Sequence, residues 1–135
     1  MLNAVNVPVQ TIPAAQSVPF AVNRVLTGCA VRHDPSSTRF VILKPGIYRV
    51  SVNADIAVTA GETVGEISLA LSQDGEAVSG ATGAITPAAV EQFGNVAFSS
   101  LIRVYGCGGT VVSVVNTSDI SVDVENANLI IERMC

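Results

Sequence analysis

Charged residues, aromatic residues and histidine are all scarce in this sequence. Charged side chains make up 13% of the 135 residues, about half of the ~25% that is usual in soluble domains. Hydrophobic residues make up 49%. Because a single chain could hardly cover its surface with so few charges, we expect much apolar surface to be hidden either between subunits or in a membrane.

Long apolar segments are also missing, which argues against the membrane. The sequence contains no run of about 18 uncharged apolar residues, the length that a bilayer-spanning helix requires. Residues 1–16, MLNAVNVPVQTIPAAQ, have no basic start and no long apolar stretch, so we expect no secretory signal peptide. The sequence therefore predicts one domain that folds in a cytoplasm and covers its apolar surface with other subunits.

Basic residues are too few for a nucleic-acid partner. The net charge is −4, and the single lysine and the arginines are scattered along the chain. A basic patch for phosphate groups is therefore not expected. The chain has no tryptophan and few other aromatic residues, which also argues against a base-stacking surface or an aromatic sugar-binding site.

The three cysteines, Cys29, Cys107 and Cys135, match no zinc-binding spacing. Their number is odd, so at least one of them is free or bonded to another chain. We favour reduced structural thiols, because disulfides are rare in a cytoplasm. A bond between chains through the terminal Cys135 is the alternative.

Side chains that could perform chemistry are isolated from one another. His33 is the only histidine and precedes Asp34 in a polar loop, where a solvated histidine is a better prediction than a general base. Asp119, Asp123 and Glu125 share one strand face, which we interpret as a solvated face rather than a calcium site. We predict no catalytic residues, no cofactor, no metal site and no enzymatic activity.

Alternation of apolar and polar residues predicts strands along most of the chain. The clearest case is GIYRVSVNADIAV, where Tyr48, Val50, Val52, Ala54 and Ile56 fall on one face. Gln73-Asp74-Gly75-Glu76 predicts a tight hairpin turn. In all, roughly eight to ten short strands predict an antiparallel sandwich or jelly roll. The other predicted strands lie within 18–28, 39–46, 66–78, 95–106, 119–126 and 128–135.

Two segments are left with alternative interpretations. Residues 1–16 alternate weakly and contain prolines, so they form an N-terminal arm or an edge strand, with the jelly-roll domain at 17–135. As an arm, they would be a candidate docking segment. TPAAVEQF, from Thr86 to Phe93, is either a helix of one or two turns or a loop.

The segment GTVVSVVNT, residues 109–117, is apolar on both faces of the strand that it predicts. Val112 and Val114 form one row, and Val111, Ser113 and Val115 form the other. An antiparallel strand with one solvated face should alternate instead. The second row therefore requires a cover that one short chain does not supply.

The order of these motifs resembles the globular heads of complement C1q-type and TNF-like proteins. FAVNRVLTG is followed by a polar loop and by RFVILKPGIYRVSVNADIAV, in which Pro45-Gly46-Ile47-Tyr48 matches the turn that opens the long central strand of that family. ISLALSQDGEAV, FSSLIRVYGCGGTVVSVVNTSD and NANLIIERM match later strands, so the resemblance covers residues 17–134. It implies a ten-strand jelly roll that assembles as a homotrimer.

In such trimers the inner sheet presents one face to neighbouring subunits, and TVVSVV and NLII would be two of its strands. The candidate interface residues are Val111, Val115, Leu129 and Ile131, and a register error of one residue would exchange the two faces.

Without a collagen stalk or signal peptide, the chain looks like stand-alone proteins of bacterial genomes and their prophages. LTGCAVRHD and TPAAVEQF have this character. The resemblance implies a structural virion protein of a tailed bacteriophage, either a trimeric capsid decoration or head-fibre subunit or a tail-associated one. Its partners would be itself, a capsid or other virion protein and a host-surface ligand. The alternative is a bacterial or spore surface module that recognises glycan or protein ligands.

Overall fold

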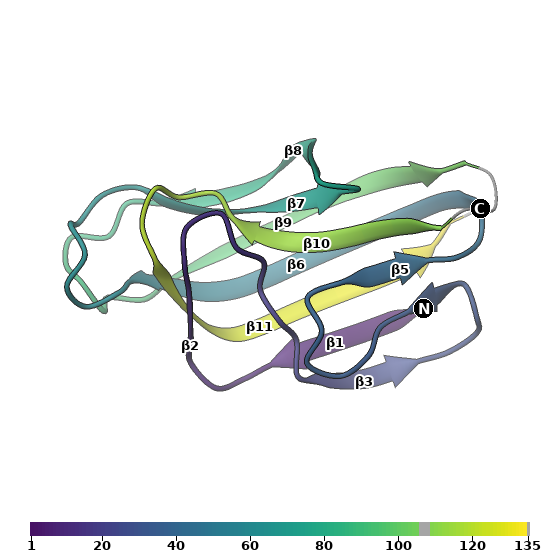
Figure 1. Cartoon of the computed structure of the whole chain (residues 1–135), viewed down its shortest axis with the longest axis horizontal. Helices are drawn as coiled ribbons and strands as arrows, with labels where there is room; N and C mark the ends of the chain where they lie inside the picture. Colours follow the sequence, from purple (N-terminus) through teal and green to yellow (C-terminus); the bar gives the residue numbers. More distant parts are fainter. Residues whose placement is uncertain (106–108, 135) are drawn as a thin grey trace.

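The computed structural model describes residues 1–105 and 109–134 and consists of two antiparallel sheets packed face to face (Figure 1). The predicted all-β antiparallel sandwich is confirmed. The described residues contain no helix, and so none long and apolar enough to cross a membrane. The strands are β1 (Leu2–Asn6), β2 (Gln10–Ile12), β3 (Val22–Leu26), β4 (Val31–Arg32), β5 (Phe40–Ile42), β6 (Gly46–Val58), β7 (Ile67–Gln73), β8 (Glu76–Ile85), β9 (Gly94–Val104), β10 (Thr110–Asn116) and β11 (Val122–Arg133).

The first sheet has the strand order β3-β1-β11-β6-β9, with β2 also paired to β11, and the second has the order β4-β5-β10-β7-β8. β1 is therefore an interior strand, bonded to β11 on one side and to β3 on the other. This corrects the expectation of an arm or edge strand for residues 2–6, whereas β2, in the same 1–16 segment, pairs only with β11 among the described strands and is an edge strand. The prolines that suggested an edge, Pro8 and Pro13, lie in the connections after β1 and β2 rather than within them.

The inner faces of the two sheets form one hydrophobic core, and period-two alternation builds it. Along β6 the predicted inward row is buried from Tyr48 to Ile56, and β7 buries Ile67, Leu69 and Leu71 as predicted. The hydroxyl of Tyr48 donates a hydrogen bond of 2.8 Å to the carbonyl oxygen of Lys44, so this buried polar atom is satisfied.

The predicted hairpin at residues 73–76 joins β7 to β8. Asp74 and Gly75 both have positive φ, 53° and 87°, which matches the two central positions of a type I′ turn. The carboxylate of Asp74 also accepts a hydrogen bond of 3.0 Å from the backbone N–H of Val111. The Asp74 side chain therefore ties the β7–β8 turn to the start of β10.

β11 unites two segments that the sequence analysis treats as separate strands, 119–126 and 128–135. An irregularity between Glu125 and Asn128 interrupts its pairing with β6, and Asn126 has a φ of 50°. Such a bulge shifts the side-chain phase by one residue. Before it, Val122 and Val124 point inward, and after it the inward residues are Ala127, Leu129 and Ile131.

β10 and β11 belong to different sheets, which corrects the placement of TVVSVV and NLII in one inner sheet. β10 lies between β5 and β7, while β11 lies between β1 and β6. Strand identity could be predicted locally, but assignment to a sheet depends on pairing between residues that are distant in the sequence.

Asn116 closes the sandwich near the end of β10 and is fully buried. Its amide nitrogen donates to the carbonyl oxygens of Ile12 at 3.0 Å, Pro13 at 3.2 Å and Ile120 at 3.0 Å. Its side-chain oxygen accepts from the N–H of Ser118 at 2.9 Å. One side chain therefore joins the chain after β2, the end of β10 and the turn that leads to β11.

Candidate functional site

The four residues predicted for subunit contact fall into two groups. Val111 and Val115 lie half-buried on the outer face of β10, as predicted for that strand. Leu129 and Ile131 have no exposed surface, because they point into the core from β11. Their expected place on the outer face is wrong, and the bulge near Asn126 is the reason. Without a bulge, a strand with Val122 and Val124 inward would turn residues 129 and 131 outward, but the inserted residue shifts the phase by one.

The outer face of the five-stranded sheet carries a short aliphatic row. Val111 pairs with Val41 on β5, and Val115 pairs with Ala70 on β7. Val115 also forms a backbone bridge to Ser17, so the chain that precedes β3 runs beside this end of β10.

The outer face of the six-stranded sheet contains a shallow depression of about 320 Å³. Small side chains of β6 and β9 form its floor, and Ile130 borders it from β11. Ile130 points outward, which was the orientation expected for Leu129 and Ile131. The residues that line this depression are Ser51, Val52, Asn53, Ala97, Phe98, Ser99, Asn128 and Ile130.

Large apolar side chains protrude near this depression, at the free edge formed by β9. Leu101 is 61% exposed and Tyr105 is 77% exposed, although both are large hydrophobic residues. Leu101 pairs with Arg49 of β6, whose guanidinium forms an ion pair of 2.5 Å with Glu132. The sequence analysis missed Leu101, because only its position on the outward face of an edge strand distinguishes it from a core leucine.

His33 is a structural residue, and the prediction of a solvated loop histidine is wrong. Its ring is only 4% exposed and stacks on Phe40 at 4.0 Å. Nδ1 lies 2.5 Å from the side-chain oxygen of Asn23, and Nε2 lies 2.8 Å from the carbonyl oxygen of Ser37. Asn23 comes from β3 and Ser37 from the turn before β5. The ring therefore fastens the 33–38 loop to the edge of the other sheet, and Asp34 is not among its bonding partners.

Replacing His33 with alanine is expected to lower the stability of the domain, because the role of this side chain is structural. The variant loses the stacking on Phe40 and leaves polar groups of Asn23 and Ser37 without partners, for an expected cost of about 2–3 kcal/mol. Chemical denaturation followed by circular dichroism would measure it. A loss below about 0.5 kcal/mol, the size typical of a surface substitution, would contradict the fastening role.

The carboxylates near the start of β11 do not form a metal site within the described part of the chain. Asp123 is half-buried, and its Oδ1 accepts hydrogen bonds from the hydroxyls of Thr11 at 2.8 Å and Thr59 at 2.9 Å. Its role is to join β2, β11 and the loop after β6. Cys29 is exposed, while Cys107 and Cys135 lie outside the described residues, so their state stays a prediction.

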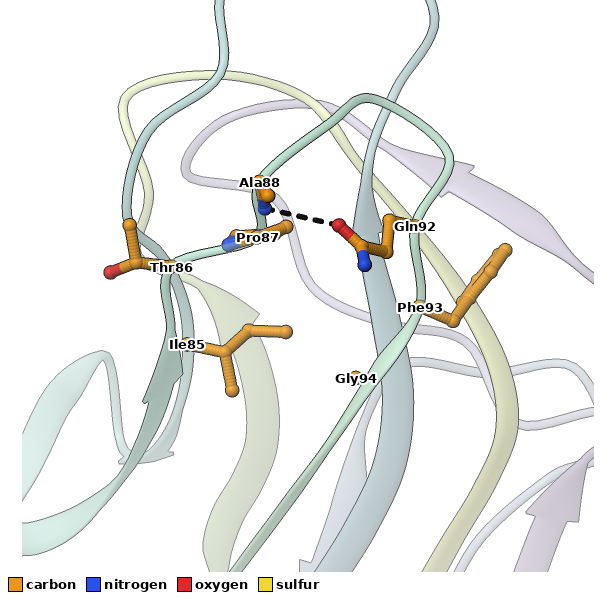
Figure 2. Close-up of a pocket in the computed structure, with 7 residues that line it drawn as sticks. All are labelled: Ile85, Thr86, Pro87, Ala88, Gln92, Phe93 and Gly94. Carbon is orange, nitrogen blue, oxygen red and sulfur yellow. Dashed lines mark hydrogen bonds between the residues drawn. The ribbon is translucent and has the colours of Figure 1, made fainter.

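A pocket of about 350 Å³ lies where the 86–93 segment connects β8 to β9 (Figure 2). This segment is a loop, which decides between the two interpretations of TPAAVEQF. Two hydrogen bonds hold its shape: Glu91 N–H donates to the carbonyl oxygen of Val58 at 2.8 Å, and Ala88 N–H donates to the side-chain oxygen of Gln92 at 3.1 Å. In Figure 1 it lies at the left end of the sandwich with the 59–66 loop.

No protein-family model matches the chain, and a search of curated proteins finds no match. Solved structures do match over almost the whole chain. The globular domain of a zebrafish complement C1qA protein has a TM-score of 0.68 and 14% identity, covering 96% of this chain and 94% of that one. Eiger TNF from S. frugiperda has a TM-score of 0.75 and 9% identity, covering 99% of this chain and 91% of that one.

A virion protein has the same fold. The PRD1 vertex protein P5 is similar with a TM-score of 0.58 and 13% identity, covering 99% of this chain and 96% of that one. At these identities the likeness establishes the fold alone. The chain has a C1q/TNF-like jelly-roll fold, which confirms the fold class that the motifs of the sequence implied.

Proposed function

We propose that the chain is a structural virion protein of a tailed bacteriophage that acts as a homotrimer, either as a capsid decoration or head-fibre subunit or in a tail-associated position. The observation that carries this proposal is the likeness of the whole chain to a phage vertex protein. The small number of charged residues supports self-association. The partner would be a capsid or other virion protein, and assembly would take place in the host cytoplasm.

The outer face of the six-stranded sheet is the proposed trimer surface. It offers a protruding Leu101 at one edge and a depression beside Ile130 nearer its centre. Leu101 and the depression lie side by side on this face, because Leu101 is two residues along β9 from Ser99, and together they form one patch. We therefore place this patch, including Leu101, against a different surface of the next copy, because such contacts close into a ring when the rotation allows.

Permanent association through this face requires a large buried area. Obligate interfaces often bury more than about 2,000 Å², and apolar area contributes about 25 cal/mol per Å² before the costs of association are subtracted. Val111 and Val115 on the other sheet remain a rival surface, because they also form an outward apolar row.

A binding module of a bacterial or spore surface is the second candidate function. The observation that favours it is the preformed loop pocket of Figure 2, which has no place in the proposed trimer contact. The same fold can serve as a decoration protein or as a ligand-binding module. The two proposals therefore differ in where the protein is found, on a virion or on a bacterial or spore surface, and not in its fold.

Purified particles provide the test of the virion role. Phage particles prepared by density gradient from cells that produce this chain should contain it, as shown by mass spectrometry, in a copy number divisible by three. Image reconstruction should place it at a symmetric capsid or fibre position. If cell fractionation instead finds the chain on the bacterial or spore surface and never in particles, the virion proposal fails and the alternative is supported.

A further inference from the structure

β9 lies at the end of the six-stranded sheet, and its free edge is long and regular. The strand has 11 residues, and its pairing with β6 runs from Gly94 to Val104 without a register shift. It contains no proline, and its single charged residue, Arg103, lies near one end. Natural sheets avoid such edges, because a straight row of unpaired backbone groups pairs readily with another chain.

The other described strands at the sheet ends carry the protections that β9 lacks. β2 and β4 have only three and two residues. β3 has five residues, and a bulge at Arg24 interrupts its pairing with β1. The pairing of β8 with β7 is interrupted over residues 78–81, where Gly80 has a φ of 80°. Because these edges are short or bulged, the plain edge of β9 is the exception and indicates a partner.

Alternate residues of β9 turn their backbone N–H and C=O groups away from β6. The carbonyl oxygen of Ile47 in β6 accepts a hydrogen bond of 2.7 Å from the N–H of Met134, which follows β11. Ile47 lies opposite Arg103, so this pair exchanges no hydrogen bonds and Arg103 turns its groups outward. By the same alternation, three preceding residues turn their groups outward, and their N–H groups have no backbone partner among the described residues: Leu101, Ser99 and Ala97.

Both ends of this edge are occupied, and its middle is open. The side-chain amide of Gln73 donates a hydrogen bond of 3.2 Å to the carbonyl oxygen of Arg103. Toward the other end β8 lies close, since a Cβ atom on Gly83 would come within 2.9 Å of Cβ of Val96. Between these points Phe98 packs toward the core but is only half-buried. The second sheet therefore does not fully cover the middle of β9, and Figure 1 shows the arrow end of β9 reaching beyond β7 and β8.

We propose that the middle of this edge, residues 97–101, binds an extended segment of another protein as an added strand. The outward N–H and C=O groups of Ala97, Ser99 and Leu101 pair with the backbone of that segment, which is the way that strand addition gives affinity. The edge points along the plane of the sheet, whereas the Leu101 patch proposed for the trimer faces outward from the sheet. The inference therefore goes beyond the proposed function and does not depend on it.

The surroundings of the edge select an uncharged segment with apolar residues at alternate positions. No side chain from Val96 to Ile102 is charged. On the inner side, the half-buried ring of Phe98 offers an apolar contact. On the outer side, Ala97 and Ser99 are small and leave room for neighbouring side chains. A strand that turns β-branched residues toward Phe98 and polar residues outward fits both sides.

A single strand fits this edge better than a second copy of the whole chain does. An added strand needs only about 4.8 Å of space beside β9. In a second copy placed edge to edge, the β8 that lies against each β9 would also approach its counterpart, as the close contact at Gly83 implies. Pairing between copies is the alternative, and the state of the free protein distinguishes it.

The test is amide hydrogen exchange of the whole chain, measured by NMR with the peptide acetyl-Lys-Thr-Val-Thr-Val-Thr-Lys-amide. In the free protein the N–H groups of Ala97, Ser99 and Leu101 should exchange fast, whereas those of Phe98 and Ser100, which pair with β6, should be protected. We expect weak affinity, because few hydrogen bonds form and the peptide must be ordered. When about nine-tenths of the protein is bound, exchange at the three positions should slow about tenfold, because only the free fraction exchanges.

A control peptide and a pair of variants isolate the backbone pairing. Replacing Val-Thr-Val in the peptide with three prolines keeps its charge and extended shape but removes the N–H groups, so exchange should not slow. Ser99→Pro removes the outward N–H at the middle of the edge and leaves the hydrogen bonds to β6 in place. Its affinity for the first peptide should fall about tenfold or more, while Ser99→Ala, which keeps the backbone, should bind like the wild type.

Each outcome decides the proposal. Equal slowing by both peptides, or unchanged binding by a folded Ser99→Pro, would overturn it, as would no slowing at the highest soluble concentration of the first peptide. If the three N–H groups are protected without peptide, the edge pairs with another copy and the assignment to a partner segment is wrong. The comparison of the peptides needs no variant, so it decides the proposal even if Ser99→Pro does not fold. The trimer is measured separately by light scattering.

Discussion

Replacing Leu101 with aspartate is expected to convert the trimer into folded monomers. Leu101 is 61% exposed in the single chain, so a carboxylate there costs the monomer little. In the proposed trimer the same carboxylate would be removed from water without a partner, and burying an unpaired charge is costly enough to prevent association. Light scattering should show the mass falling from three chains to one, with the circular dichroism spectrum unchanged.

Val115→Asp is the matched control on the rival surface. Val115 is half-buried on the outer face of β10, and it was one of the positions that the sequence predicted for the interface. If the six-stranded sheet forms the contact, Val115→Asp should remain trimeric. If Val115→Asp becomes monomeric and Leu101→Asp stays trimeric, the contact lies on the five-stranded sheet. A wild-type chain that is a stable monomer would reject both surfaces.

Replacing Asn116 with alanine is expected to have the largest effect on stability of any single polar substitution proposed for this chain. The variant leaves the carbonyl oxygens of Ile12, Pro13 and Ile120, and the N–H of Ser118, without their partner in a fully buried position. Each unsatisfied buried group costs about 1–3 kcal/mol, so we expect a loss of about 3–5 kcal/mol after some relaxation. Urea denaturation would measure it.

Asn116→Asp separates hydrogen bonding from shape. Aspartate has nearly the same size, but it places an oxygen where the amide nitrogen now donates to three carbonyl oxygens. The variant should therefore lose at least as much stability as Asn116→Ala. A variant with nearly wild-type stability would mean that packing, and not the donor, is what this position supplies.

Local patterns in the sequence were enough to predict the strands and the class of fold. The alternation in β6 gives the same bounds as the structure, because each side chain there follows the pleat without interruption. The hairpin at Asp74-Gly75 was predictable for the same reason: the two residues alone tolerate the positive φ that the turn needs. Features of this kind depend only on residues that are close together in the chain, so a single sequence is enough to predict them.

The outer surfaces could not be predicted, because they depend on irregularities and distant contacts. One residue inserted in the pairing near Asn126 moves Leu129 into the core and Ile130 out of it. Asn126, with a φ of 50°, marks that bulge, and asparagine is among the few residue types that tolerate positive φ. His33 is buried by residues from β3 and from the loop that follows it. The loop pocket depends on the conformation of ten residues with no regular pattern.

The pairing of β1 with β11 also determines when the chain can fold. Leu2 lies opposite Ile131, so this pairing joins residues that are far apart in the sequence. Contacts between such distant residues form slowly, because the loop between them must first be closed. β1 can therefore pair with β3 well before β11 has been made, and a chain that stops before residue 122 would leave β1 with only one of its two neighbours.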